Sequence, residues 1–148
     1  MASRTHPLSW KELCQYDKNP PKIALIRTKE IEQKYEVHRD YLIKNNIKIG
    51  DYINSKYFSN EKENNKYCFV TNTFPYACED NIQHYLIWIN PKFNASFPDS
   101  LNSSKFEPIV KMEVKKIFND SECIFFENAM EFKSVKAIRH MHIFIKSN

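Results

Sequence analysis

The sequence predicts an α+β protein in which an antiparallel sheet of about four to five strands carries one packed amphipathic helix and a helical N-terminal extension. Three observations lead to this fold class. The N-terminal third is rich in helix formers, four short β-rich runs follow it in two pairs, and a helical pattern separates the pairs. The 148 residues suffice for a single domain, 1–148, with 1–58 as the extension and 67–148 as the sheet and helix.

The extension begins with a capping box. Ser9 and Glu12 have the spacing at which each side chain caps the backbone N–H of the other, which predicts a short helix over 10–16. A second helix is expected over 22–45. One face of it carries residues that recur at helical spacing, namely Ile31, Tyr35, His38 and Leu42.

The chain changes from helical to β-rich after Phe58. Before that point, Gly50 and Asp51 break the pattern and offer an N-cap for a third short helix. After it, the β-rich runs predict four strands: Tyr67–Thr71, Gln83–Ile89, Glu122–Glu127 and Ile138–Lys146. An amphipathic helix is expected over 107–118, between the two pairs, and each pair suggests an antiparallel hairpin.

Composition excludes several function classes. A single glycine leaves no phosphate-cradling loop, and the lysines behind the net charge of +4 are spread along the chain instead of forming a nucleic-acid stripe. No apolar run approaches the ~20 residues of a membrane span. Four separated cysteines and the lack of a signal peptide indicate a reduced compartment, the cytoplasm or the nucleus. A homodimer is compatible with these features.

The last strand carries the residues best suited to chemistry. Side chains two positions apart on a strand share a face, so Ile138, His140, His142 and Phe144 line one side. The two imidazoles are then roughly 7 Å apart along the strand. This separation suits a nucleophile beside a group that orients it, or two ligands of one metal.

Other polar and aromatic residues lie next to the strands. His84 begins the second predicted strand, and Asn72, Phe74 and Tyr76 lie in the loop before it. Asn128 and Ser134 lie in the turn that leads to the final strand. If the two hairpins join into one sheet, these groups converge at one end of it.

Four motifs in this order resemble a largely fungal family that is named for N-acetylglucosamine-induced proteins and is a domain of unknown function. They are Trp10-x-x-Leu13, Asn72-x-Phe74-Pro75-Tyr76, His84-x-x-x-Trp88, and a closing Ser134-Val135 with His140-x-His142-x-Phe144. The C-terminal two thirds also resembles the histidine triad superfamily of nucleotide hydrolases and transferases. There a His-bearing strand precedes Pro-Lys, here Pro91-Lys92, and the chain ends in a His-x-His-x-His strand.

The triad resemblance implies a mechanism. The middle histidine of the last strand, here His142, would attack an α-phosphate and form a nucleotidyl-histidine, with His140 orienting it or holding the phosphate. A neutral imidazole is a competent nucleophile near physiological pH. The expected ligand is a nucleotide or nucleotide-sugar-type phosphate, without cofactor or metal. Its binding residues would be Asn72, Phe74, Tyr76, His84, Asn128 and Ser134.

The third triad position departs from the superfamily pattern. Phe144 stands there, and a phenyl ring cannot donate a hydrogen bond to phosphate. Two other hypotheses therefore stay open. One is a catalytically inactive ligand-binding or interaction protein that retains the pocket. The other is a metal-dependent enzyme in which His84, His140 and His142 are the ligands.

Overall fold

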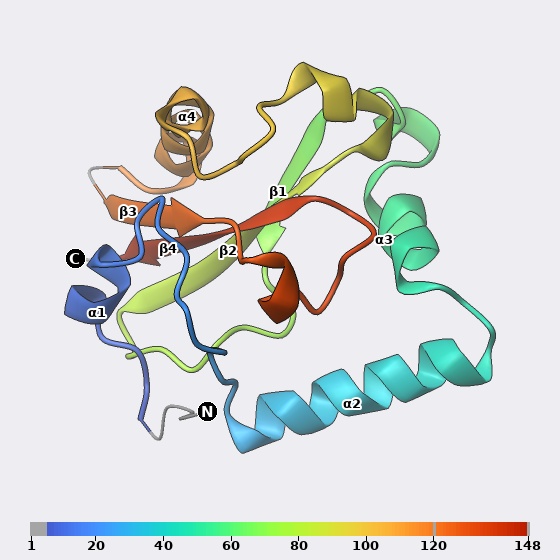
Figure 1. Cartoon of the computed structure of the whole chain (residues 1–148), viewed down its shortest axis with the longest axis horizontal. Coiled ribbons are helices and arrows are strands. Elements are labelled where there is room, and N and C mark those ends of the chain that lie inside the picture. The colour runs from blue at the N-terminus through green and yellow to red at the C-terminus, as the bar shows by residue number, and fades with distance from the viewer. Residues whose placement is uncertain (1–5, 120, 148) are drawn as a thin grey trace.

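The computed structural model describes residues 6–119 and 121–147 and shows one antiparallel sheet with helices on both faces (Figure 1). The predicted α+β class is confirmed. The strands are β1 (Tyr67–Thr71), β2 (Ile82–Ile89), β3 (Glu122–Phe126) and β4 (His140–Lys146). The helices are α1 (Trp10–Cys14), α2 (Lys29–Lys44), α3 (Ile49–Tyr57) and α4 (Glu107–Ile117). Within the described residues, no helix is both long and apolar enough to cross a bilayer.

The two predicted hairpin pairs join through β2 and β4 into the sheet order β1-β2-β4-β3, with every neighbouring pair antiparallel. This junction decides where the histidines lie. His84 is opposite Phe144, and His140 is opposite Trp88, with His142 between them. Because side chains alternate along each strand, His84, His140 and His142 all emerge on the same face of the sheet.

The other face of the sheet packs against α4. Val110 and Val114 are four positions apart and therefore face the same way, onto the apolar side chains of the sheet. Pro108 fits the first turn of this helix, as the sequence predicts, because its missing N–H has no partner to lose there. The buried core of this face consists of Tyr85, Ile87, Ile89, Leu101, Phe106, Val110, Val114, Phe125, Met141, Ile143 and Ile145.

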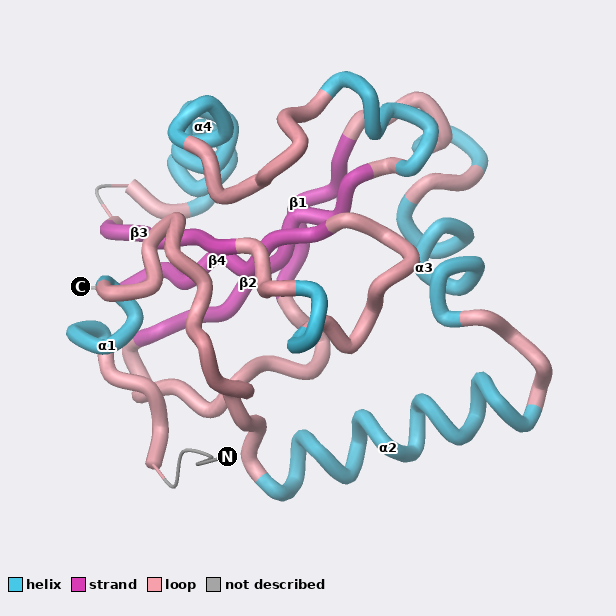
Figure 2. Tube along the Cα trace, in the orientation of Figure 1, coloured by secondary structure: helices cyan, strands magenta, loops and turns pink. Residues whose placement is uncertain are grey.

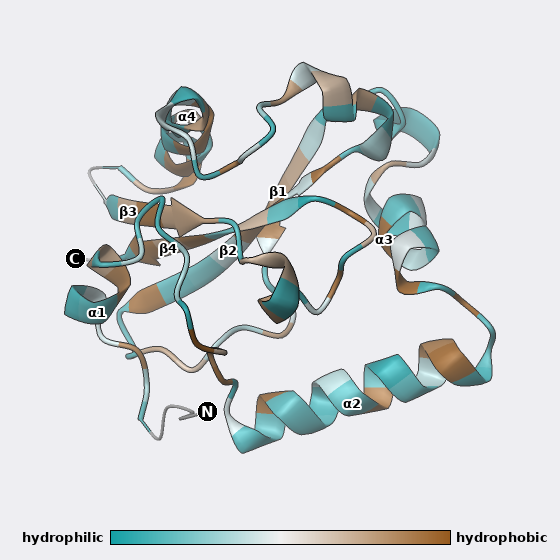
Figure 3. Cartoon of the chain, in the orientation of Figure 1, coloured by the Kyte–Doolittle hydropathy of each residue, from teal (hydrophilic) through white to brown (hydrophobic). Residues whose placement is uncertain are grey.

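The histidine face is covered by the N-terminal third and by the segment before β4. The predicted capping box is present at α1, where Glu12 N–H donates to Ser9 Oγ at 3.2 Å and Ser9 N–H donates to Glu12 Oε1 at 3.3 Å. Helix α2 is mostly hydrophilic and lies at the rim of the molecule (Figures 1 and 3), where Leu42 is its one buried residue.

Two details of the predicted helices are wrong. The second helix begins at Lys29, because Thr28 is its N-cap and accepts from Ile31 N–H at 3.3 Å. Residues 22–28 instead form an extended loop (Figure 2) that pairs with the 74–78 segment, with Ala77 N–H donating to Ile26 O at 2.9 Å. The third helix begins at Ile49 with Lys48 as N-cap, so Gly50 and Asp51 lie inside its first turn.

The predicted long loops contain short helical turns. These 3₁₀ turns span Asn60–Lys62, Pro91–Ser96, Ser104–Phe106 and Met130–Phe132. The last strand begins at His140, two residues later than predicted. Ile138 is nevertheless buried against α3, so the segment before β4 packs as part of the core.

The only glycine of the sequence lets α3 approach this segment closely. A Cβ at Gly50 would lie 2.8 Å from the Cβ of Ala137, which is closer than two carbon atoms can pack. Gly50→Ala is therefore expected to lower the free energy of unfolding by about 1–2 kcal/mol, despite the better helix propensity of alanine. The double variant Gly50→Ala/Ala137→Gly should recover this loss in urea denaturation. Equal destabilisation in the single and double variants would contradict the assigned contact.

Candidate functional site

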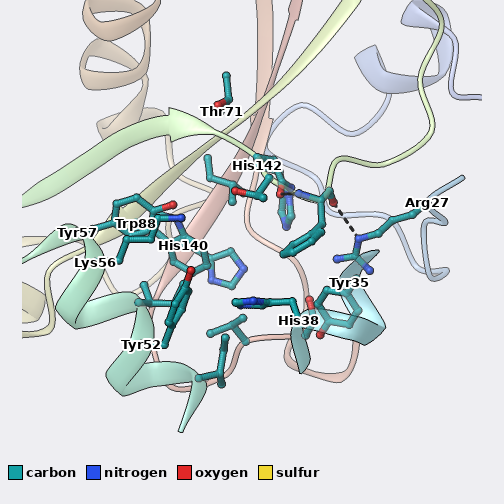
Figure 4. A pocket seen from close by; sticks show the side chains of 18 residues that line it. Arg27, Tyr35, His38, Tyr52, Lys56, Tyr57, Thr71, Trp88, His140 and His142 are labelled. Atoms are coloured by element: carbon teal, nitrogen blue, oxygen red, sulfur yellow. Dashed lines mark hydrogen bonds between the residues drawn. The ribbon is translucent and has the colours of Figure 1, made fainter. Parts of the chain in front are cut away.

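A pocket opens on the histidine face between the sheet, α3 and the middle of α2 (Figure 4). It encloses about 740 Å³ of empty space, including its mouth. His140 and His142 from β4 reach it, as predicted for the final strand. The lining also includes Arg27, so the pocket brings the N-terminal third of the chain next to the last strand.

The predicted site residues divide into two groups. Five of them line the pocket: Asn72, Phe74, Ser134, His140 and His142. The other three, Tyr76, His84 and Asn128, are buried behind its wall and hydrogen-bonded to it or to one another. Asn72 closes the loop before β2, because its Oδ1 accepts from Phe74 N–H at 2.9 Å and its own N–H donates to His84 O at 3.0 Å.

The buried residues form a closed hydrogen-bond circuit that consists of Tyr76, His84, His142 and Asn128. Tyr76 N–H donates to His84 Nδ1 at 3.1 Å. His84 Nε2 lies 2.8 Å from His142 Nδ1, and His142 Nε2 lies 3.2 Å from the Asn128 amide. The same amide is 2.9 Å from the Tyr76 hydroxyl, which returns the circuit to its starting residue.

The circuit fixes the proton on each ring. His84 Nδ1 accepts from a backbone N–H, so neutral His84 carries its proton on Nε2 and donates it to His142 Nδ1. His142 then carries its proton on Nε2, which needs an acceptor. We therefore assign the Asn128 amide orientation that puts its oxygen, not its nitrogen, opposite His142 Nε2 and the Tyr76 hydroxyl. Both ring nitrogens of His142 are then engaged.

His140 is bonded differently. Its Nδ1 lies 2.9 Å from Ile138 O, and since a carbonyl oxygen can only accept, Nδ1 carries the proton. The lone pair is then on Nε2, for which the described residues provide no hydrogen-bond partner. The ring lies tilted against the ring of Trp88, with the centroids 4.7 Å apart, and points into the pocket (Figure 4).

Burial keeps all three rings neutral. It lowers the pKa of His84 and of His142 well below the ordinary value, and the positive charge of Arg27 acts in the same direction on both. Burial also lowers the pKa of His140 to about 4, although the bond to Ile138 O opposes the shift. Near neutral pH the pocket therefore presents an unprotonated Nε2 on His140.

The pocket wall is cationic. Arg27 and Lys56 line it, and none of its described lining residues is Asp or Glu. Arg27 is held by its Nε, which donates to Phe74 O at 2.9 Å. No carboxylate of the described residues lies within ion-pairing distance of Lys56 Nζ, which sits over the rings of Tyr52 and Tyr57. Such a wall attracts anions.

The sequence did not predict that Arg27 and Lys56, or the aromatic side chains opposite the sheet, would line the pocket. Tyr35 and His38 recur at helical spacing, which predicts a packed face, whereas the structure places them on the pocket wall. The spacing of Tyr52 and Lys56, four residues apart on one helix face, is the signal that could have indicated a cation beside an aromatic ring.

The three histidines are not arranged as metal ligands. The facing nitrogens of His84 and His142 are 2.8 Å apart and share a proton, which leaves no room for an ion between them. Across the described ranges, no three side chains of His, Cys, Asp or Glu gather as a metal site would require. The four cysteines are free thiols.

A family described as "Protein of unknown function (DUF3605)" matches residues 9–146, which is nearly the whole chain. The chain belongs to the DUF3605 family. The predicted membership in an uncharacterised family is thus confirmed at this level. No curated protein matches the DUF3605 chain in sequence. Among solved structures, its fold is similar to the crystal structure of HTC1, with a TM-score of 0.61 and 17% identity over 95% of this chain and 85% of that one. This likeness concerns the fold alone.

Proposed function

We propose that this protein is a phosphohydrolase or nucleotidyl transferase of histidine-triad type that binds a ring-bearing phosphate such as a nucleotide. The observation that carries the proposal is the state of His140. Its proton is held on Nδ1 by Ile138 O, and its free Nε2 points into a pocket that contains two cations and no carboxylate among its described residues. A fixed tautomer with an exposed lone pair is the arrangement that a histidine nucleophile needs.

The reaction follows from this arrangement. The Nε2 lone pair of His140 attacks phosphorus, an N–P bond forms, and the P–O bond to the leaving group breaks. The leaving oxygen takes the electron pair and a proton from water. The positive charge on the ring is stabilised by Ile138 O, which accepts from Nδ1–H. Water, or another hydroxyl acceptor, then attacks phosphorus and releases its proton to solvent, which replaces the proton taken by the leaving oxygen, and the N–P bond returns its electron pair to Nε2.

This assignment differs from the expectation that His142 is the nucleophile. Each nitrogen of His142 has a partner in the circuit, and its lone pair accepts from His84. Attack by His142 would first require two buried hydrogen bonds to break, at a cost of about 1–3 kcal/mol for each group left without a partner. We therefore assign to His142, His84 and Asn128 the role of holding the wall from which His140 projects.

Two features support the binding of a ring-bearing anion. Arg27 and Lys56 supply charge-assisted hydrogen bonds for phosphate oxygens. The aromatic side chains of the pocket, among them Phe74 and Trp88, offer flat faces for a planar base. Ser134 and Asn72 add polar groups on the wall.

The position of Phe144 favours a second candidate, a pocket that binds its ligand without turnover. Phe144 is fully buried and stacks at 4.2 Å on His84, behind the pocket wall, so it contributes no donor to a bound phosphate. Without that donor, transition-state stabilisation depends on the two cations.

One experiment separates the two candidates. The protein is incubated with nucleoside diphosphates, nucleoside triphosphates and nucleotide-sugars, and digested peptides are examined by mass spectrometry at neutral pH, where phosphoramidates survive. A nucleotidyl adduct is expected on His140, and His140→Gln should reduce it by more than about 10³-fold. An adduct on His142 would overturn the assignment of the nucleophile. Ligand binding with no adduct on either ring would overturn catalysis and support the inactive pocket.

A further inference from the structure

Two rows of aromatic and imidazole rings connect the cations of the pocket. The row on the sheet side runs through Tyr57, Trp88, His140, His142 and Tyr76. The row on the helix side runs through Tyr52, His38, Phe74 and Tyr35. Successive ring centroids in both rows are between 4.7 Å and 6.1 Å apart. We call these the sheet row and the helix row.

Both rows begin at Lys56 and end at Arg27. Lys56 Nζ lies 5.4 Å from the ring of Tyr57, the first of the sheet row, and 5.7 Å from Tyr52, the first of the helix row. Arg27 Cζ lies 5.8 Å from the ring of Tyr76 and 4.4 Å from that of Tyr35, the last rings of the two rows. The two cations share no ring contact and stand at opposite sides of the pocket (Figure 4). The pocket is therefore a slot with a cation at each end.

The charges at the two ends are available to a ligand. Arg27 uses its Nε on Phe74 O, and its pairing with Glu32 is a long contact of 3.5 Å to a half-exposed carboxylate. Burial acts to lower the pKa of Lys56, but Tyr57 and Tyr52 outweigh burial and raise it above its ordinary value, so the amine stays charged. Each end can thus take its own anionic group.

We infer that the slot recognises a two-ended anion, a molecule with a planar ring between the two rows, one negative group at Arg27 and another at Lys56. This deepens the proposed function and rests on it, because it specifies the substrate class of the same pocket. His140 stands in the middle of the sheet row.

Calorimetric titration with nucleoside 3′,5′-bisphosphates of the four common bases tests the inference, with the matching 3′- and 5′-monophosphates as single-ended probes. The bisphosphate of at least one base is expected to bind at least about tenfold more tightly than either of its monophosphates, because a second charge-assisted hydrogen bond forms. Lys56→Met and Arg27→Gln should each abolish this advantage. Lys56→Arg should retain it, because the charge remains at the same end.

Lys105→Met is the matched control, since Lys105 is exposed in the 3₁₀ turn that leads into α4, on the other face of the sheet. It removes the same charge and should leave the advantage unchanged. Equal affinities for bisphosphates and monophosphates, or no binding of any probe, would overturn the two-ended slot. A nucleotidyl adduct on His140 would still uphold the proposed reaction in that case. Tighter bisphosphate binding without any adduct would support the slot and overturn the reaction.

Discussion

Lowering the pH from 7 to 5 is expected to reduce the free energy of unfolding by on the order of 5 kcal/mol. The loss comes from His84, His140 and His142, which are buried as neutral rings. Their pKa values are lowered in the folded protein from an ordinary 6.5, to about 4 for His140 and well below 6.5 for the other two. A domain of this size has about 5–15 kcal/mol of stability in total, so the effect is large.

The sign follows from proton binding. Below pH 6.5 the unfolded chain takes up protons on these histidines, whereas the folded protein does not, so protons stabilise the unfolded state. Stability is fully present above pH 6.5 and falls by up to about 1.4 kcal/mol per pH unit for each histidine as the pH decreases toward the folded pKa.

Urea denaturation between pH 7 and pH 5 measures the effect above the range in which most carboxylates titrate. His140→Gln removes one of the three groups and should reduce the loss by about a third. A slope that does not differ between the parent protein and His140→Gln would show that His140 is not held neutral by burial.

His142→Ala is expected to lower the free energy of unfolding by about 4 kcal/mol at pH 7. The substitution leaves a cavity within the sheet row and removes the partner of both His84 Nε2–H and the Asn128 amide. Each buried polar group left unpaired costs about 1–3 kcal/mol, and the loss of ring packing adds to this. His142 is also in ring contact with Tyr76 and Phe126, at 5.1 Å and 5.5 Å.

The measurement is again urea denaturation, with His38→Ala as the comparison. His38 also packs between two aromatic rings, but it is only partly buried and lies at the pocket mouth. Its replacement should cost about 1 kcal/mol or less. If His142→Ala were as mild as His38→Ala, the circuit would not be a stabilising element, and His142 would regain its place as a candidate nucleophile.

The sheet could be predicted from the sequence because each strand is a short β-rich run with its own apolar side chains. The predicted run Tyr67–Thr71 matches the observed strand, and strand alternation alone predicts that His140 and His142 share a face. The segment 22–28 could not be predicted in the same way. Its residues are compatible with a helix, and only its pairing with the 74–78 loop, distant in sequence, makes it extended.

The site residues that lie on one strand could be predicted from the sequence. The hydrogen-bond partners of these residues could not, because tertiary contacts determine them. The shared face of His140 and His142 follows from strand geometry alone. The division of labour between them depends on which backbone or side-chain group each nitrogen meets, Ile138 O in one case and His84 in the other. No spacing in the sequence predicts these hydrogen bonds. The same holds for Arg27, which reaches the pocket only because the chain before α2 is extended.

The arrangement of the two rows assigns a role to the first third of the chain. Without Arg27, Tyr35, His38, Tyr52 and Lys56, the sheet would present His140 on a surface open to water. The final strand thus holds the reactive ring, and segments more than eighty residues away in sequence close the pocket over it. A truncated chain that began at β1 would therefore keep His140 but lose the N-terminal residues that cover it.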